Sequence, residues 1–214
     1  MTKIIAIDGP AGSGKSSVSK EVAKRLGYGY LDTGAAYRAL AWAWLAGKVA
    51  NLDSAPVEAL RAFDYSISLD PSDYWVKVAQ TDVTSQIRES EVAEKVSEVA
   101  RIPEVRSFMK ELTRSLVSQS GFAGVVVEGR DITTVVAPDA EVRILLTASE
   151  AVRLKRRASE IGSEPSQVER QVSNRDALDS KVVDFMTPAD GVTLVDSTDL
   201  DFEQTVKAVL DLVR

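Results

Sequence analysis

The chain of 214 residues contains no cysteine and no histidine. Without cysteine, disulfide bonds, thiolate zinc sites and cysteine nucleophiles are excluded. Without histidine, the protein has neither an imidazole base nor an imidazole metal ligand. Phosphoryl transfer to an anionic acceptor is compatible with these absences, because a phosphate oxygen is already largely deprotonated near neutral pH and needs no strong base.

Long apolar runs are also absent, and no segment approaches the ~20 residues of a membrane span. The first three residues lead directly into an apolar segment, which leaves no room for a secretory signal. We therefore expect a cytoplasmic protein with no membrane partner. The net charge of −6 disfavours nucleic acid as a partner.

A glycine-rich stretch begins at Gly9, after the apolar run Ile4–Ile7, and matches the P-loop spacing Gly-x-x-x-x-Gly-Lys-Ser without a mismatch. Such a loop turns several backbone N–H groups toward one anion. Lys15 adds a charge for the β- and γ-phosphates, and the Ser16 hydroxyl is placed to bind Mg²⁺. The residues expected to bind ATP are Gly9, Pro10, Ala11, Gly12, Ser13, Gly14, Lys15, Ser16 and Ser17.

Short apolar runs alternate with helical patterns along most of the chain. This rhythm predicts an α/β fold, with a five-stranded parallel sheet flanked by helices, as in P-loop NTP hydrolases. The expected strands are 4–7, a segment ending at Leu31, 125–128, 142–148 and 191–197. The expected helices between and after them are 16–26, 35–46, one from Glu150, and 201–213.

Residues 63–83 have a different pattern, with apolar and polar residues in alternation around a turn at Pro71–Asp73. A period of two residues predicts half-exposed antiparallel strands. Two helical patterns follow, 91–101 and 105–118, separated at Pro103. We expect a single P-loop kinase domain over 1–214, with an insertion at about 63–100 and a helical lid at about 153–182.

Polar side chains follow the predicted strands, at the edge of the sheet where ligands bind. Arg38 follows the second strand, and Glu128, Arg130 and Asp131 follow the third. Taken alone, either arginine is as consistent with a surface ion pair as with anion binding. Together they suit a second phosphate beside the P-loop, held by two guanidinium groups. The cationic run Arg153–Arg157 is either a solvated helix face or part of a lid over the nucleotide.

Two longer segments resemble the signatures of bacterial cytidylate kinases. They are "IDGPAGSGKSSVSKEVAKRLGYGYLDTGAAYR" and "VVVEGRDITTVVAPDAEVRILLTASEAVRLKRR". The segments "SQIRESEVAEKVSEVARIPEVR" and "NRDALDS" are similar to the insertion and lid of the same family. Together these segments cover most of the chain, and "LDTGAAYR" with "EGRDI" is far more specific than the P-loop alone.

The resemblance implies roles for individual residues. Catalysis would involve Lys15, Arg157 and Arg175. The phosphate of the acceptor would be held by Tyr37, Arg38, Arg88 and Arg130, with Thr33 beside them and Arg175 on the lid side. Cytosine would be read by Ser97, Arg106 and Asp131, and the ribose would be held by Asp179. A carboxylate, an arginine and a hydroxyl complement the amino donor and the two acceptors of cytosine.

The sequence departs from the family pattern at three positions. Val182 stands where the family usually has arginine, with Lys181 before it. Thr133 stands in place of a usual glycine, and Ala137 in place of a bulky aromatic residue. An ammonium group does not replace a guanidinium fork, so we expect altered affinity rather than a different reaction.

The resemblance implies a monomeric kinase that transfers the γ-phosphate of ATP to CMP or dCMP, with Mg²⁺. The nearest alternative is a P-loop kinase for another small acceptor, such as UMP, AMP or a coenzyme precursor. A non-catalytic nucleotide-binding protein is a further alternative, which Val182 favours because it stands where the family usually has arginine. A GTPase would need an Asn-Lys-x-Asp motif, but Asn51 and Asn174 precede leucine and arginine.

Overall fold

The computed structural model describes residues 2–161 and 185–213. The chain divides into two compact units. The first unit combines Met1–Leu31 with Gly121–Arg214, and the second is the continuous stretch Asp32–Ser120. The residues predicted to bind ATP, 9–17, all belong to the first unit.

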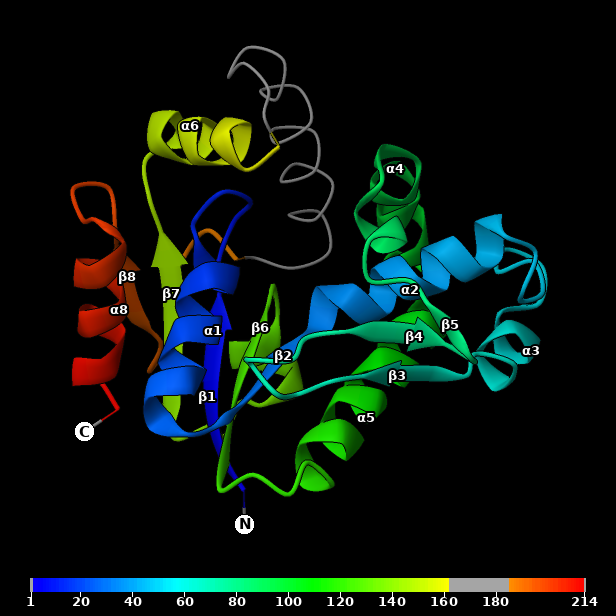
Figure 1. Ribbon diagram of the computed structural model, residues 1–214, viewed down its shortest axis with the longest axis horizontal. Helices are drawn as coiled ribbons and strands as arrows, with labels where there is room; N and C mark the ends of the chain where they lie inside the picture. Colours follow the sequence, from blue (N-terminus) through cyan, green and yellow to red (C-terminus); the bar gives the residue numbers. More distant parts are fainter. Residues whose placement is uncertain (1, 162–184, 214) are drawn as a thin grey trace. The chain divides into compact units, whose positions relative to one another are not determined.

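The first unit contains a five-stranded sheet in the order β2-β6-β1-β7-β8 (Figure 1). Its strands are β1 (Lys3–Asp8), β2 (Gly29–Asp32), β6 (Gly124–Gly129), β7 (Val142–Thr147) and β8 (Thr193–Asp196). β1 is paired in parallel with both β6 and β7, and β7 with β8. Asp8 is level with Gly129 on one side and Leu145 on the other, so the carboxyl ends of the three central strands meet at one edge. The predicted five-stranded parallel sheet is confirmed.

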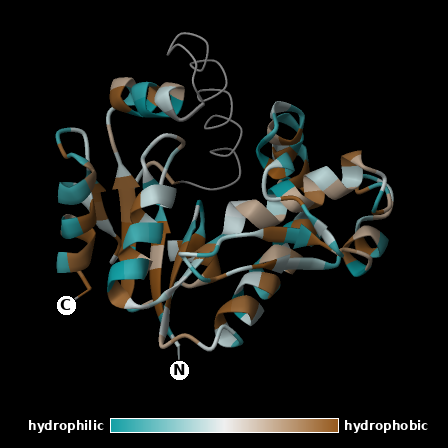
Figure 2. Cartoon of the chain, in the orientation of Figure 1, coloured by the Kyte–Doolittle hydropathy of each residue, from teal (hydrophilic) through white to brown (hydrophobic). Residues whose placement is uncertain are grey.

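Three helices and one π-helical turn complete the described part of this unit. They are α1 (Lys15–Leu26), η2 (Ile132–Val136), α6 (Glu150–Ile161) and α8 (Phe202–Asp211). Every residue of β6 is buried, as expected for a strand inside a parallel sheet. In Figure 2 the strands are coloured as hydrophobic, whereas α1 and α8 also carry hydrophilic residues. Among the described residues, no helix has the length and apolar character to cross a membrane.

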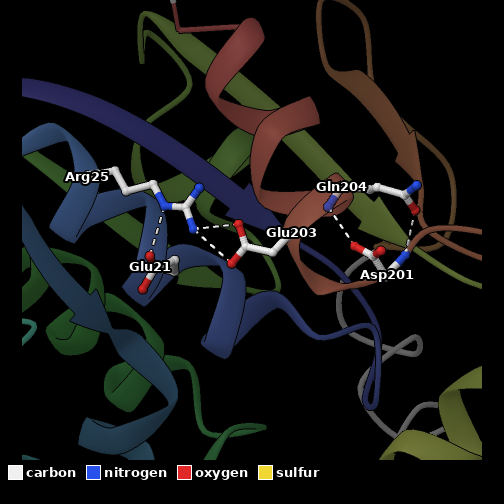
Figure 3. Close-up of polar contacts among 5 residues, drawn as sticks. All are labelled: Glu21, Arg25, Asp201, Glu203 and Gln204. Carbon is white, nitrogen blue, oxygen red and sulfur yellow. Dashed lines mark hydrogen bonds and ion pairs between the residues drawn. The ribbon is translucent and has the colours of Figure 1, made fainter.

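The last turn of α1 is tied to the first turn of α8 (Figure 3). Arg25 donates to Glu21 within α1 at 2.8 Å and to both carboxylate oxygens of Glu203 in α8 at 2.7 and 2.9 Å. α8 begins with a capping box, in which Asp201 and Gln204 each accept the other's backbone N–H. These contacts fix the end of α1 that lies away from the P-loop.

The second unit combines a small sheet with helices. Its sheet is antiparallel in the order β3-β4-β5, which confirms the strands predicted within 63–83. Its elements are α2 (Thr33–Leu45), α3 (Pro56–Arg61), β3 (Tyr65–Ile67), β4 (Val76–Val78), β5 (Thr81–Asp82), η1 (Gln86–Arg88), α4 (Ser90–Val99) and α5 (Pro103–Ser118). The predicted helices 35–46, 91–101 and 105–118 correspond to α2, α4 and α5, whereas α3 and the 3₁₀ turn η1 were not predicted.

Candidate active site

The P-loop joins β1 to α1, and its glycines are required for two different reasons. Gly12 and Gly14 have left-handed backbones, with φ of 74° and 86°, which side chains disfavour. Gly9 instead packs against the neighbouring strand, because a Cβ at Gly9 would lie 2.2 Å from the carbonyl oxygen of Leu146. The loop therefore has the tight backbone that the spacing predicts.

The loop ends at the first turn of α1, whose helix dipole is positive at this point. Gly14 is the N-cap residue, no side chain of the described residues caps the helix, and its first turn contains no acidic residue. The first N–H groups of α1 thus remain available to an anion. Lys15 is half-buried, and its Nζ lies 3.4 Å from the carbonyl oxygen of Pro10, so the side chain lies along the loop itself.

A buried carboxylate at the end of β6 contacts the P-loop serine. Glu128 is 2% exposed, and its Oε1 accepts a hydrogen bond from the Ser16 hydroxyl at 2.6 Å and another from the Tyr30 hydroxyl at 3.1 Å. Hydroxyl and carboxylate oxygens are the ligands that Mg²⁺ prefers. The sequence placed Glu128 at the ligand-binding edge of the sheet but assigned it no role, and the contact with Ser16 supplies one.

The last residue of β1 connects the P-loop strand to the segment that follows Asp131. Asp8 is buried, and its carboxylate accepts from the backbone N–H of Ile132 at 2.9 Å, from that of Thr133 at 2.8 Å and from the Thr133 hydroxyl at 2.6 Å. Burial raises the pKa of Asp8 and outweighs these hydrogen bonds, which lower it; the negative charge of Asp131 raises it further. Asp8 thereby anchors the start of η2.

The cationic run on α6 lies against the P-loop. Arg153 is buried and donates to the carbonyl oxygen of Ala11 at 2.9 Å. Arg156 donates to the carbonyl oxygen of Ser13 at 3.2 Å. These two arginines are therefore not on a solvated helix face. Arg157 is half-buried on the same helix, and its catalytic role stays a prediction.

The segment after β6 holds two residues predicted to bind the acceptor. Arg130 is half-buried, and its guanidinium carbon lies 4.3 Å from the ring centroid of Phe185. This distance is typical of a cation–π contact, which holds a guanidinium plane against an aromatic face. Asp131 is the N-cap residue of η2, next to the backbone that Asp8 anchors.

In the second unit, the N-terminal turn of α2 places three of the predicted residues close together in the chain. Thr33 is buried, whereas Tyr37 and Arg38 are half-buried. Arg38 donates to Asp32 at 2.6 Å, and Asp32 also caps α2 by accepting from the N–H of Ala35 at 3.1 Å. This ion pair fixes the direction of the Arg38 side chain.

A buried phenol lies near the ion pair of Asp32 and Arg38. The pKa of Tyr65 is raised well above 10 by burial first, and then by Tyr74 and Asp32, while Arg38 opposes the increase. Tyr65 therefore stays neutral and places only the partial charges of its hydroxyl near Arg38.

The remaining predicted residues are spread over the second unit and beyond the described segments. Arg88 is exposed in η1, Ser97 is half-buried on α4, and Arg106 is half-buried on α5. Arg175 and Asp179 lie outside the described residues, as do Val182 and most of the predicted lid. Because Arg38 and Arg130 belong to different units, their predicted convergence stays a prediction.

Comparison of the chain with known proteins shows its family. The family model described as cytidylate kinase matches residues 5–214. The chain belongs to the cytidylate kinase family. It is 44% identical to a cytidylate kinase of Streptomyces avermitilis over 214 residues, which covers 99% of this chain and 92% of the relative. It is 44% identical to a cytidylate kinase of Cutibacterium acnes over 219 residues, covering 98% and 95%.

A solved structure supports the fold alone. An uncharacterized protein from Eubacterium ventriosum superposes with a TM-score of 0.55 at 12% identity, covering 98% of this chain and 97% of that one. Membership of the cytidylate kinase family confirms the resemblance seen in the two signature segments.

Proposed function

We propose that the protein transfers the γ-phosphate of ATP to CMP or dCMP, giving ADP and CDP or dCDP. The observation that carries the proposal is a complete P-loop whose serine contacts a buried carboxylate at 2.6 Å, in a chain of the cytidylate kinase family. The relatives that are 44% identical over nearly their whole length bear the name of this activity.

On the donor side, the P-loop backbone and the start of α1 bind the triphosphate. Ser16 and Glu128 would hold a magnesium ion through their oxygen atoms, either directly or through water. The chemistry that such an ion would supply is positive charge beside the β- and γ-phosphates. Lys15 swings from the carbonyl oxygen of Pro10 to the phosphates, where an ammonium group finds stronger acceptors than a neutral carbonyl.

On the acceptor side, Arg38, Arg88 and Arg130 bind the phosphate of CMP. The base is read by Asp131, Ser97 and Arg106. The family resemblance supports these roles residue by residue, and Asp179 holds the ribose. Two contacts support the proposal indirectly. Phe185 holds the guanidinium group of Arg130, and Asp8 holds the backbone next to Asp131. Rigid support of this kind keeps a binding group in the productive orientation.

Catalysis then consists of positioning and charge stabilisation. The phosphate oxygen of CMP is already an anion, so the absence of histidine removes nothing that the transfer requires. Lys15, Arg157 and Arg175 neutralise the charge that spreads over the transferred group. We infer that the enzyme acts as a monomer, which light scattering during size-exclusion chromatography measures directly.

A panel of acceptors tests the proposal. The purified chain is given MgATP with CMP, dCMP, UMP or AMP, and formation of ADP is followed in a coupled assay. We expect CMP or dCMP to be preferred, and Lys15→Ala to lose turnover by orders of magnitude. A preference for AMP, UMP or none of the four would refute the proposed substrate. Asp131→Ala should weaken the discrimination between CMP and UMP more than it weakens the use of either.

A further inference from the structure

Arg153 and Arg156 of α6 hold the carbonyl side of the P-loop, and we propose that they shape it for the triphosphate of ATP without touching the nucleotide. The inference rests on the proposed function, because it concerns how the donor nucleotide is bound. Both residues would be positioning residues. The same helix carries Arg157, for which a catalytic role is predicted.

Arg153 is built into the wall of the loop. It is only 6% exposed, and Nη1 donates to the carbonyl oxygen of Ala11 at 2.9 Å. Its backbone lies so close to the loop that a Cβ on Gly12 would be 2.4 Å from the Arg153 carbonyl oxygen. Arginine is almost never this buried unless it is paired, so the contact with Ala11 is part of why this side chain is tolerated there.

Arg156 connects the loop to the end of the sheet. Its Nη1 donates to the carbonyl oxygen of Ser13 at 3.2 Å and to the hydroxyl of Ser197 at 2.9 Å. Its Nη2 donates to the carbonyl oxygens of Ser197 at 2.9 Å and Leu200 at 3.3 Å. Ser197 is itself fully buried and donates to the carbonyl oxygen of Thr147 at the end of β7. One planar guanidinium group thus fixes Ser13 against the segment that follows β8.

The geometry of the peptide group converts these contacts into an effect on the phosphate site. A trans peptide is planar, and its N–H points away from its C=O. The Ala11 carbonyl shares a peptide with the N–H of Gly12, and the Ser13 carbonyl shares one with the N–H of Gly14. Holding both carbonyls toward α6 therefore holds both N–H groups on the opposite side of their peptides, away from the arginines.

A charged donor on the carbonyl also polarises the peptide, which makes its N–H a stronger donor. The loop is therefore in its anion-binding shape before ATP arrives, and binding spends less free energy on ordering it. The described hydrogen bonds of both side chains reach the P-loop and the segment after β8, so we expect the effect on the donor side.

Isothermal titration of the full chain with MgATP and, separately, with CMP tests the proposal. We expect Arg153→Gln and Arg156→Gln each to weaken MgATP binding by roughly 10-fold, the size of one charge-assisted hydrogen bond, and to leave CMP binding unchanged. Lys155→Gln is the matched control, because Lys155 is exposed on the same helix and its loss removes the same charge.

Lysine variants separate the bracing geometry from the charge. The described hydrogen bond from the Arg153 side chain to the loop uses a single nitrogen, so Arg153→Lys should restore most of the MgATP affinity. Arg156 uses both terminal nitrogens of its fork on three residues, so Arg156→Lys should not restore it. This pair also carries the test if the glutamine variants do not fold. Steady-state assays should show the same pattern in KM for ATP.

Each outcome decides between the proposals. If the unmodified chain does not bind MgATP, the proposed function fails and the inference with it. If it binds MgATP but both arginine variants bind equally well, only the inference fails. An equal loss of MgATP and CMP affinity, or an equal effect of Lys155→Gln, would overturn the inference as well, because either result indicates a general effect on folding or charge.

Discussion

Replacing Thr133 with valine removes the hydroxyl that donates a hydrogen bond to the buried carboxylate of Asp8, and it changes the size of the side chain little. Asp8 receives three hydrogen bonds, and the hydroxyl of Thr133, at 2.6 Å, is the shortest of them. A hydrogen bond to a charged group contributes roughly 1.5–3 kcal/mol to stability, so we expect Thr133→Val to lose about 2 kcal/mol of unfolding free energy at neutral pH. Two backbone donors remain on Asp8, which is why the loss should not be larger.

The loss should depend on pH in a defined direction. The pKa of Asp8 is raised by burial and lowered by the Thr133 hydroxyl, so removing that hydroxyl raises the pKa further. A carboxyl group whose pKa is raised in the folded state costs stability as the pH rises from its unfolded pKa to its folded pKa. The stability of the valine variant should therefore fall furthest below that of the unmodified protein at pH values above the folded pKa of Asp8 in both proteins, and the difference should narrow as the pH falls through these raised pKa values toward the ordinary value of about 4.

Urea unfolding followed by far-ultraviolet circular dichroism measures this difference. Tryptophan fluorescence is unsuitable, because Trp42, Trp44 and Trp75 all lie in the second unit, whereas the substitution is in the first. Thr134→Val is the control, since Thr134 is exposed and adjacent. If Thr133→Val and Thr134→Val were equally stable at neutral pH, or if acidification widened the gap, the account of Asp8 would be refuted.

Three further predictions concern single side chains. The buried hydroxyl of Ser13 has no hydrogen-bond partner among the described residues, so Ser13→Ala should raise the free energy of unfolding by about 1 kcal/mol in urea, and a decrease would contradict this. Phe185→Leu removes the aromatic face under Arg130, and the KM for CMP should rise by about 2- to 10-fold while the KM for ATP stays unchanged; equal rises would count against it. Tyr30→Phe removes a donor to Glu128, so the Mg²⁺ concentration for half-maximal turnover should shift about 5-fold, whereas Tyr28→Phe should leave it unchanged.

Regular elements were predictable wherever local pattern and tertiary environment agree. The apolar runs at 4–7 and 125–127 lie in strands because a parallel sheet covered on both faces favours apolar residues throughout its strands. The alternation within 63–83 likewise predicted the small antiparallel sheet. The short helix α3 was missed although Pro56 at its first turn is a recognised start signal, because six residues are too few for a clear helical period.

The supporting residues of the site were harder to predict, because their partners are distant in sequence. Asp8 and Thr133 are 125 residues apart, and the π-helical turn they fix has no local signature. For Arg153 and Arg156, helical spacing shows that they share a side of α6, but only the hydrogen bonds to Ala11 and Ser13 show that this side meets the P-loop. Sequence patterns thus identified the P-loop, and the structure identified what holds that loop.

The division of the chain also bears on how such a protein can change over evolution. Asp32–Ser120 is one uninterrupted stretch, joined to the rest at only two points, and it contains Tyr37, Arg38, Arg88, Ser97 and Arg106. The P-loop and its supporting residues lie wholly in the other unit. A recombination event that exchanged this stretch between relatives would transplant most of the proposed acceptor chemistry in one step, and leave the machinery for the donor nucleotide intact.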